Sequence, residues 1–302
     1  MENKKKISGL AKAIWITAAV TVVSAIVAVC FAVSFGSAAL KELTDNRHDS
    51  KKTIVYNSKE LDKLADIEDY SELISSEIHT IPVIGNSVII KSQIAKIKVI
   101  SSDSDDIKTE FNQYSNNKDA ASLFSLSIDG QTFKINCNED TNVIPVLIIS
   151  VPKDTVNNIT IENEAGDIDV NGISVFNLKI TNSTGKISIE NTTSNDADIK
   201  NYTGEIELAK SFRCIYKMDV SGKFGNIDFE LPQDINFKLQ YSVSLGEADL
   251  SEVDMEKYNI VSRANIAKTN GTLECKEKDG EQANYNMTMS VGRIELSSET
   301  DF

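Results

Sequence analysis

Histidine, tryptophan and basic residues are scarce in this 302-residue chain. Its two histidines, His48 and His79, are too few for a histidine-rich metal site or a pair of cooperating imidazoles. Lysine and arginine total 31 against 45 acidic residues, which gives a net charge of −14. Proteins that bind nucleic acid need a basic surface, so no nucleic-acid partner is expected. Apolar residues make up 41% of the chain, which excludes wholesale disorder and allows a sizeable core.

One long apolar stretch stands near the N-terminus. Residues 13–40 carry no charge, and about 20 apolar residues in a helix span a bilayer. Residues 1–12 contain four lysines, which favours a cytoplasmic N-terminus and export of the remainder. A cleaved signal peptide is the alternative, because Ser37-Ala38-Ala39 resembles a cleavage site, although the apolar run is longer than a signal peptide needs. We predict a single-pass transmembrane helix in the plasma membrane, with an extracytoplasmic domain.

Residues 41–80 predict a juxtamembrane linker that contains a short helix. The first part, 41–52, is polar and mixed in charge. Across 58–78, apolar residues recur at intervals of three or four, at Leu61, Leu64, Ile67, Tyr70, Ile74 and Ile78. This spacing places an apolar stripe on one face of a helix.

A six-residue pattern recurs through the second half of the chain. Each copy has a glycine followed by alternating polar and apolar residues, as in Thr184-Gly185-Lys186-Ile187-Ser188-Ile189. The glycines are Gly166, Gly185, Gly204, Gly225, Gly246, Gly271 and Gly292, with Gly271 in a weaker copy. They are separated by 19, 19, 21, 21, 25 and 21 residues, a period typical of stacked structural repeats.

The alternation within each unit predicts two short strands. Apolar residues stand seven and five positions before each glycine and two and four positions after it, with polar residues between the latter two. Period-two alternation gives a strand one buried and one wet face, and glycine permits the bend between the strands. Such a unit cannot bury its apolar face alone, so neighbouring units should stack into a β-solenoid over residues 153–302. A β-sandwich of hairpins is the alternative, because it also has short strands at regular intervals.

Less regular strands are predicted upstream, in residues 81–152, where they would cap the stack. These strands span 88–90, 94–100, 107–114, 123–128, 132–136 and 146–151. The expected fold class is therefore all-β, preceded by the single transmembrane helix.

The order of these features resembles a known family. A lysine-flanked span, strands ending in Ile149-Ser150-Val151-Pro152-Lys153, and serial Thr/Ser-Gly-x-Ile-x-Ile/Leu units resemble the bacterial "putative adhesin" family of β-strand-repeat proteins. The similarity covers residues 81–296. The family is a domain of unknown function, often found among envelope-stress and membrane-regulator genes. The resemblance implies a non-enzymatic exported or surface module.

No constellation of residues predicts a catalytic, cofactor-binding or metal site. Cys137, Cys214 and Cys275 lie outside the span, and an odd number leaves at least one thiol without a disulfide. Cys275 stands at an inward repeat position, so a buried small hydrophobe is expected there. The cluster Asp103-Ser104-Asp105-Asp106 offers oxygen ligands for calcium, but it lacks the glycine and distal glutamate of an EF-hand, and a polar loop explains it equally well.

The outward positions beside the glycines are mostly acidic. Like charges stacked on neighbouring strands repel. Either cations sit there, or the ladder is interrupted by Lys186, Lys200, Asn226 and Arg293 to leave a solvated face.

We expect a non-enzymatic, membrane-anchored binding or scaffolding module at the bacterial cell envelope, related to envelope stress. Its partner would be an envelope protein or a surface polymer, bound by the outward faces of the repeats. A surface adhesin that binds glycan or cells is the alternative. A carbohydrate-active enzyme is a weaker one, because no pair of carboxylates stands out. The open ends of a stack can pair edge to edge, so self-association is a further option.

Overall fold

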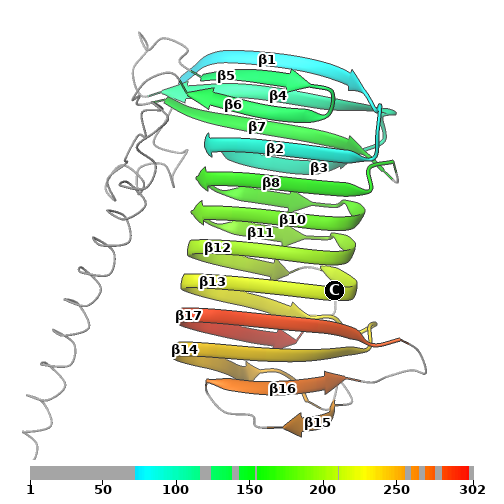
Figure 1. The fold of residues 1–302 in the computed structure, drawn as a ribbon, viewed down its shortest axis with the longest axis vertical. Coiled ribbons are helices and arrows are strands. Elements are labelled where there is room, and N and C mark those ends of the chain that lie inside the picture. The colour runs from blue at the N-terminus through cyan, green and yellow to red at the C-terminus, as the bar shows by residue number, and fades with distance from the viewer. Residues whose placement is uncertain are drawn as a thin grey trace, which may run out of the picture. The chain divides into compact units, whose positions relative to one another are not determined.

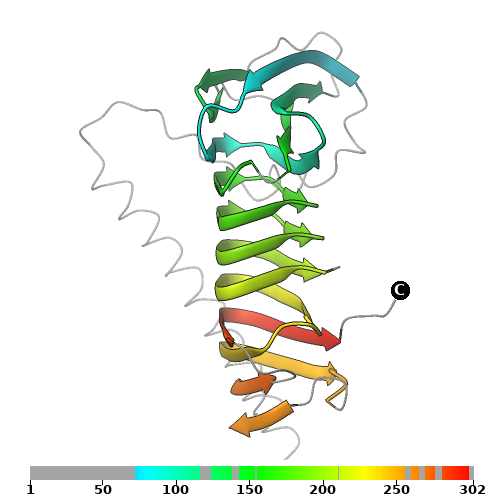
Figure 2. The ribbon, with the colours of Figure 1, turned by 90° about the vertical axis from the view of Figure 1, so that its right-hand side faces the viewer.

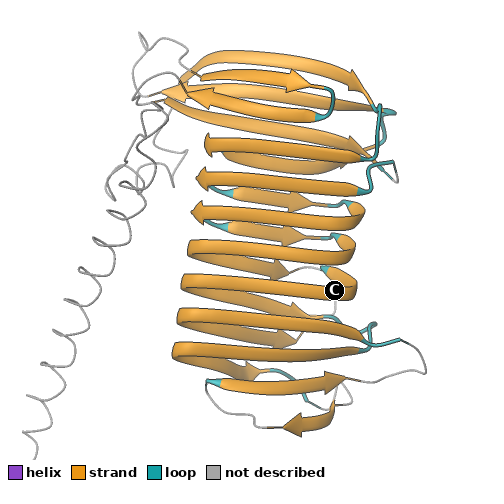
Figure 3. Cartoon of the chain, viewed as in Figure 1, coloured by secondary structure: helices purple, strands orange, loops and turns teal. Residues whose placement is uncertain are grey.

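The computed structural model describes residues 72–298, apart from 116–123, 138–142, 154, 210, 256–259, 265–268 and 276–280. These residues belong to one compact unit, Tyr56–Phe302. They form seventeen strands in a single curled sheet and contain no helix, which confirms the all-β prediction (Figure 3). The predicted transmembrane segment 13–40 lies outside them. Nothing within the described residues has the helical length and apolarity of a membrane span.

Most of the strands belong to a stack of coils, which Figures 1 and 2 show from two sides. A coil has one limb before its bend and one limb after it, here called the pre-glycine and post-glycine limbs. In three coils the limbs are separate strands: β2 (Ser87–Ile94) with β3 (Lys96–Ser102), β8 (Asn158–Ala165) with β9 (Ile168–Asn171), and β10 (Ser174–Thr184) with β11 (Ile187–Glu190). In the other four, one strand continues through the bend: β12 (Thr193–Ala209), β13 (Arg213–Leu231), β14 (Phe237–Glu252) and β17 (Ala283–Ser298).

Neighbouring coils pair in parallel and in the same register. Gly204 pairs with Gly225, and Gly225 in turn pairs with Gly292. Equivalent positions of the repeat therefore form columns that run along the stack. Parallel pairing between units differs from the antiparallel ladders that a sandwich of hairpins would have.

The core consists of the columns that point inward. Ile206, Ile227 and Ile294 follow one another along the stack, and each is fully buried. Of the apolar repeat residues predicted to face inward, all those whose side chains the structure describes are buried except Leu250, which is half-buried. The period-two prediction is thus confirmed.

The bend in each coil requires glycine. Gly166, Gly185, Gly204, Gly225, Gly246 and Gly292 have φ between 113° and 140°, which side-chain-bearing residues rarely adopt. The bends are also too close for a side chain, because a Cβ on Gly225 would overlap the carbonyl oxygen of Gly204.

Three buried asparagines reinforce the same bends. Asn163, Asn182 and Asn201 each stand three residues before a bend glycine. The Nδ2 of Asn182 donates to the carbonyl oxygen of Gly166 at 3.0 Å, and that of Asn201 donates to Gly185 at 2.7 Å. Each amide thus satisfies a backbone carbonyl of the preceding coil.

The C-terminal strand does not end the stack. β17 lies between β13 and β14 and pairs in parallel with both, as the red strand in Figure 1 shows. Stacking in chain order would instead set Asp228 of β13 beside Asp249 of β14. In the observed order Glu295 lies between these two aspartates, and Arg293, two residues earlier on β17, forms an ion pair with Asp249.

Gly271 is not a repeat glycine, so that part of the prediction is wrong. It lies in β16 (Asn270–Cys275), which pairs antiparallel with β14 and with β15 (Ile260–Ala264). Gly271 lies opposite Tyr241, outside the column of bend glycines. Cys275 is nevertheless fully buried as expected, because it pairs opposite Phe237.

The helix predicted within 58–78 is wrong over residues 72–78. These residues belong to β1 (Glu72–Pro82), which pairs antiparallel with β4. Pairing with β4 satisfies the backbone of β1, while Ile74 and Ile81 pack against the core. Residues 58–71 of the predicted helix lie outside the described part of the chain.

The strands predicted within 81–152 are present. Besides β2 and β3, they are β4 (Asp106–Ser115), β5 (Phe124–Asp129), β6 (Thr132–Cys137) and β7 (Val143–Pro152). β6 and β7 pair in parallel with β2 and β3, so they extend the stack beyond its first coil.

The close contacts in the column of bend glycines predict that two glycine substitutions differ strongly in their effect on the free energy of unfolding. Gly225→Ala should lower the free energy of unfolding by about 2 kcal/mol or more, because the new Cβ meets backbone and φ is unfavourable. Gly130→Ala is the control, because no atom lies within 4 Å of its Cβ position. The control should cost only about 1 kcal/mol for its left-handed φ. Equal losses in a urea melt would contradict the role of the column.

The position of β17 predicts the effect of a truncation. A chain that ends at residue 282 loses the strand between β13 and β14 and should lose its cooperative thermal transition. In a stack built in chain order, the same deletion would remove only a terminal repeat and leave the rest folded. A chain that ends at residue 298 is the control, and circular dichroism with calorimetry measures both.

Candidate functional site

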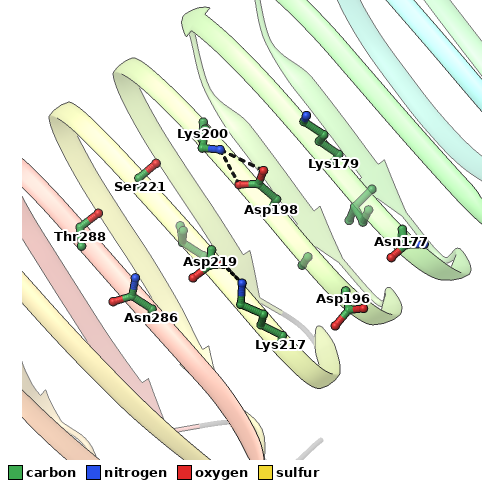
Figure 4. Close-up of a pocket in the computed structure, with 13 residues that line it drawn as sticks. Asn177, Lys179, Asp196, Asp198, Lys200, Lys217, Asp219, Ser221, Asn286 and Thr288 are labelled. Atoms are coloured by element: carbon green, nitrogen blue, oxygen red, sulfur yellow. Dashed lines mark hydrogen bonds and ion pairs between the residues drawn. The ribbon is translucent and has the colours of Figure 1, made fainter.

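A shallow groove crosses the outer face of the pre-glycine limbs of β10, β12, β13 and β17 (Figure 4). It has a volume of about 510 Å³. We call it the polar groove, because the side chains that face it are Asn177, Lys179, Asp196, Asp198, Lys200, Lys217, Asp219, Ser221, Asn286 and Thr288.

The repeat itself positions these side chains. Leu178, Ala197 and Val220 point into the core, so the residues that alternate with them point outward. The parallel register sets Asp198 beside Asp219, and Asp219 beside Asn286. Neighbouring groups are therefore held at the spacing of paired strands, about 4.8 Å.

The formal charges of the polar groove cancel. Three lysines and three aspartates line it, although the whole chain carries −14. Lys200 Nζ lies 2.9 Å from Asp198 Oδ1, and Lys217 Nζ lies 2.6 Å from Asp219 Oδ2 (Figure 4). The hydrogen bond with Asp219 raises the pKa of Lys217.

Exposed aromatic rings stand near both ends of the groove. Phe176 and Tyr216 directly precede Asn177 and Lys217, and their exposed fractions are 55% and 48%. Tyr202, at 53%, follows Lys200 by two residues on the same face of β12. Lys223 Nζ lies 5.8 Å from the centroid of the Tyr202 ring, within the range of a cation–π contact.

The outer face of the post-glycine limbs holds charges of both signs that pair between coils. Lys98 lies 3.2 Å from Asp169, and Lys186 lies 2.6 Å from Glu207. Lys186 and Arg293 interrupt the column one residue after the bend glycines, as predicted. Asn226 also interrupts this column, between Glu205 and Arg293. The column three residues after the glycines instead keeps four neighbouring acids, Glu207, Asp228, Glu295 and Asp249. Lys200 is instead part of the polar groove.

Asp228 is the centre of a group of carboxylates on this second face. Burial raises its pKa to about 6, and a hydrogen bond with Glu205 and repulsion by Glu205, Glu295 and Glu207 add to the increase. Asp228 therefore becomes protonated more readily than an ordinary aspartate.

The other candidate residues do not assemble into a site. Asp103 Oδ1 accepts a hydrogen bond from Lys153 Nζ at 2.8 Å, and this bond lowers the pKa of Asp103. Within the described residues, no three histidine, cysteine or acidic side chains are arranged to hold a metal ion. Cys214 and Cys275 are buried and form no disulfide with a described residue. Burial raises the pKa of Cys214 to about 11, so it is a poor nucleophile.

Comparison with known proteins agrees with the repeat architecture. Residues 86–299 match the family model described as Toastrack DUF4097. The chain belongs to this family. The resemblance to β-strand-repeat proteins labelled "putative adhesin" is thereby confirmed. No curated protein matches this Toastrack chain.

Several solved structures have distant similarity to this Toastrack protein. A "putative cell adhesion protein" from Clostridium sporogenes is 11% identical, with a TM-score of 0.45 over 76% of this chain and 100% of the other. A "putative adhesin" from Bacteroides fragilis is 13% identical, with a TM-score of 0.38 over 74% and 97%. A "putative lipid binding protein" from Parabacteroides distasonis is 14% identical, with a TM-score of 0.34 over 73% and 96%.

The raised pKa of Asp228 predicts a pH-dependent stability. The folded pKa of about 6 lies above the unfolded value of about 3.9, so the folded state binds the extra proton. The stability that this proton provides is present below about pH 4 and is lost as the pH rises through about 6. Asp228→Asn should therefore stabilise the protein at pH 7.5, on the order of 1 kcal/mol after solvent screening, and change little at pH 4.

Thermal melts of the Asp228→Asn variant at the two pH values measure this difference. The control is Asp249→Asn, which removes a carboxylate paired with Arg293 and should give no gain at pH 7.5. A gain of equal size at both pH values would contradict the origin of the effect in the titration of Asp228.

Proposed function

We propose that this Toastrack chain is a non-enzymatic binding or scaffolding module at the bacterial cell envelope. In this proposal a transmembrane helix over residues 13–40 anchors a β-solenoid outside the plasma membrane, and the polar groove contacts an envelope component. The apolar segment with its preceding lysines supports the anchor. The putative-adhesin family is often found among envelope-stress genes, which supports a role in the envelope-stress response.

The polar groove is the observation on which the proposal depends. It gathers outward side chains from four coils onto a surface whose shape the inward ladders hold. Two of its three aspartates are ion-paired with lysines of the same strand. A carboxylate paired in this way is a poor general base, which supports binding rather than catalysis.

A surface adhesin is the second candidate, and the exposed aromatic rings beside the groove favour it. Phe176, Tyr202 and Tyr216 are about half exposed, and aromatic side chains are enriched where proteins bind partners. An adhesin would use the same groove but would contact a polymer or another cell, and the membrane segment would act only as a tether.

Crosslinking in intact cells tests the proposal. Tagged full-length protein is compared with the variant Asp198→Lys with Asp219→Lys, which reverses charges in the groove. The control is Glu164→Lys with Glu252→Lys, which reverses two exposed charges elsewhere. We expect the native chain and the control to recover an envelope component that the groove variant loses.

The identity of the recovered component separates the two candidates. A membrane sensor or transporter supports the regulatory envelope module, whereas wall polymer or surface glycan supports the adhesin. Equal recovery by the groove variant, with its thermal melt unchanged, would overturn the assignment of the groove.

A further inference from the structure

The charges in the polar groove restrict the kind of molecule that it can bind. An anionic polymer would be repelled by the net charge of −14 and would find no excess of lysine in the groove. A cationic segment would find Asp198 and Asp219 already paired with Lys200 and Lys217. The electrostatics therefore favour an uncharged ligand.

The uncharged polar side chains of the groove are suited to hydroxyl groups, and its two other charged residues, Lys179 and Asp196, are of opposite sign. Asn177 and Asn286 each offer an amide donor and acceptor, and Ser221 and Thr288 offer hydroxyls that can do both. Sugar hydroxyls also donate and accept. These side chains project from paired strands, so less conformational entropy is lost when they bind than for groups on a mobile loop.

The exposed aromatic rings supply apolar contact. Phe176 and Tyr216 lie at one edge of the groove, on either side of Asn195 of β12, and Tyr202 lies at the other edge, seven residues farther along β12. The C–H face of a sugar ring packs against an aromatic ring and covers apolar area, while the hydroxyls at its rim remain free to form hydrogen bonds.

The spacing of the coils agrees with the repeat of a sugar chain. Paired strands are about 4.8 Å apart, which is close to the length of one sugar ring in an extended polysaccharide. We propose that the polar groove binds an extended, uncharged polysaccharide that crosses the coils with about one sugar per coil. The four strands of the groove then accommodate about four sugars. This inference rests on the second candidate function, the adhesin, because it names the ligand class of the same groove.

Titration calorimetry with neutral oligosaccharides tests the inference. Full-length protein in a mild detergent is titrated with oligomers of N-acetylglucosamine, of β-linked glucose and of mannose, each from dimer to hexamer. Oligogalacturonates of the same lengths are the anionic comparison. We expect at least one neutral series to bind, with an affinity that increases up to about four sugars and changes little with salt.

Two variants connect the binding to the groove. Tyr202→Ala removes one of the aromatic rings, and Asn286→Ala removes an amide. Each should weaken binding about tenfold without lowering the melting temperature. Leu245→Ala is the control, because it shortens an exposed apolar side chain outside the groove and should leave the affinity unchanged.

Each of the other outcomes overturns the inference. These outcomes are no binding of any neutral series, preferred binding of oligogalacturonate, and neutral binding that both variants retain. If neutral sugars fail but the groove variant still loses a protein partner in cells, the groove binds another ligand class and the proposed function stands. If no neutral oligosaccharide binds and the groove variant recovers the same envelope components as the native chain, both proposals fail.

Discussion

The close approach of the backbones at the bend is the constraint on which the rest of this structure depends. Each bend glycine lies against a backbone carbonyl group one coil away, where a single Cβ would not fit; this carbonyl belongs to Ala95 for Gly166 and to another bend glycine for the other five. Asn182 and Asn201 fix the same contact by donating to that row of carbonyls. The bends hold neighbouring coils in register, and register decides which side chains form the core and which lie together outside. The isoleucine columns and the polar groove are consequences of one backbone contact.

Local pattern determined what the sequence could predict. Inward residues such as Ile206 and Ile227 were predictable because period-two alternation is a property of each strand alone. The order of the coils was not predictable, because the segment around Gly292 has the same pattern as the segment around Gly225. The pattern does not indicate which copies become neighbours in the stack. The helix prediction for the residues of β1 was wrong for a related reason. Its three- and four-residue spacing suits a helix, but pairing with β4, which is distant in sequence, determined its conformation.

The polar groove was missed because no single repeat contains it. Its side chains come from strands as distant in sequence as β10 and β17, and none of them forms a motif with its chain neighbours. A signal was nevertheless present. When the repeats are aligned on their bend glycines, Lys179, Asp198, Asp219 and Asn286 all stand six positions before the glycine. In a stacked repeat, such a column is the natural unit in which to look for a site, since residues that share a column become neighbours.

The ion pairs of the post-glycine face and those of the polar groove differ in a way that indicates which surface is available for function. On the post-glycine face, Lys98–Asp169, Lys186–Glu207 and Arg293–Asp249 connect different coils, so these pairs help to select the neighbours and the position of β17. In the groove, Lys200–Asp198 and Lys217–Asp219 each lie within one strand and connect no coils. Exposed pairs of this kind add little stability. The fold therefore places few demands on the groove residues, whose identities are free to be set by a ligand, whereas the charges of the opposite face also serve the stack.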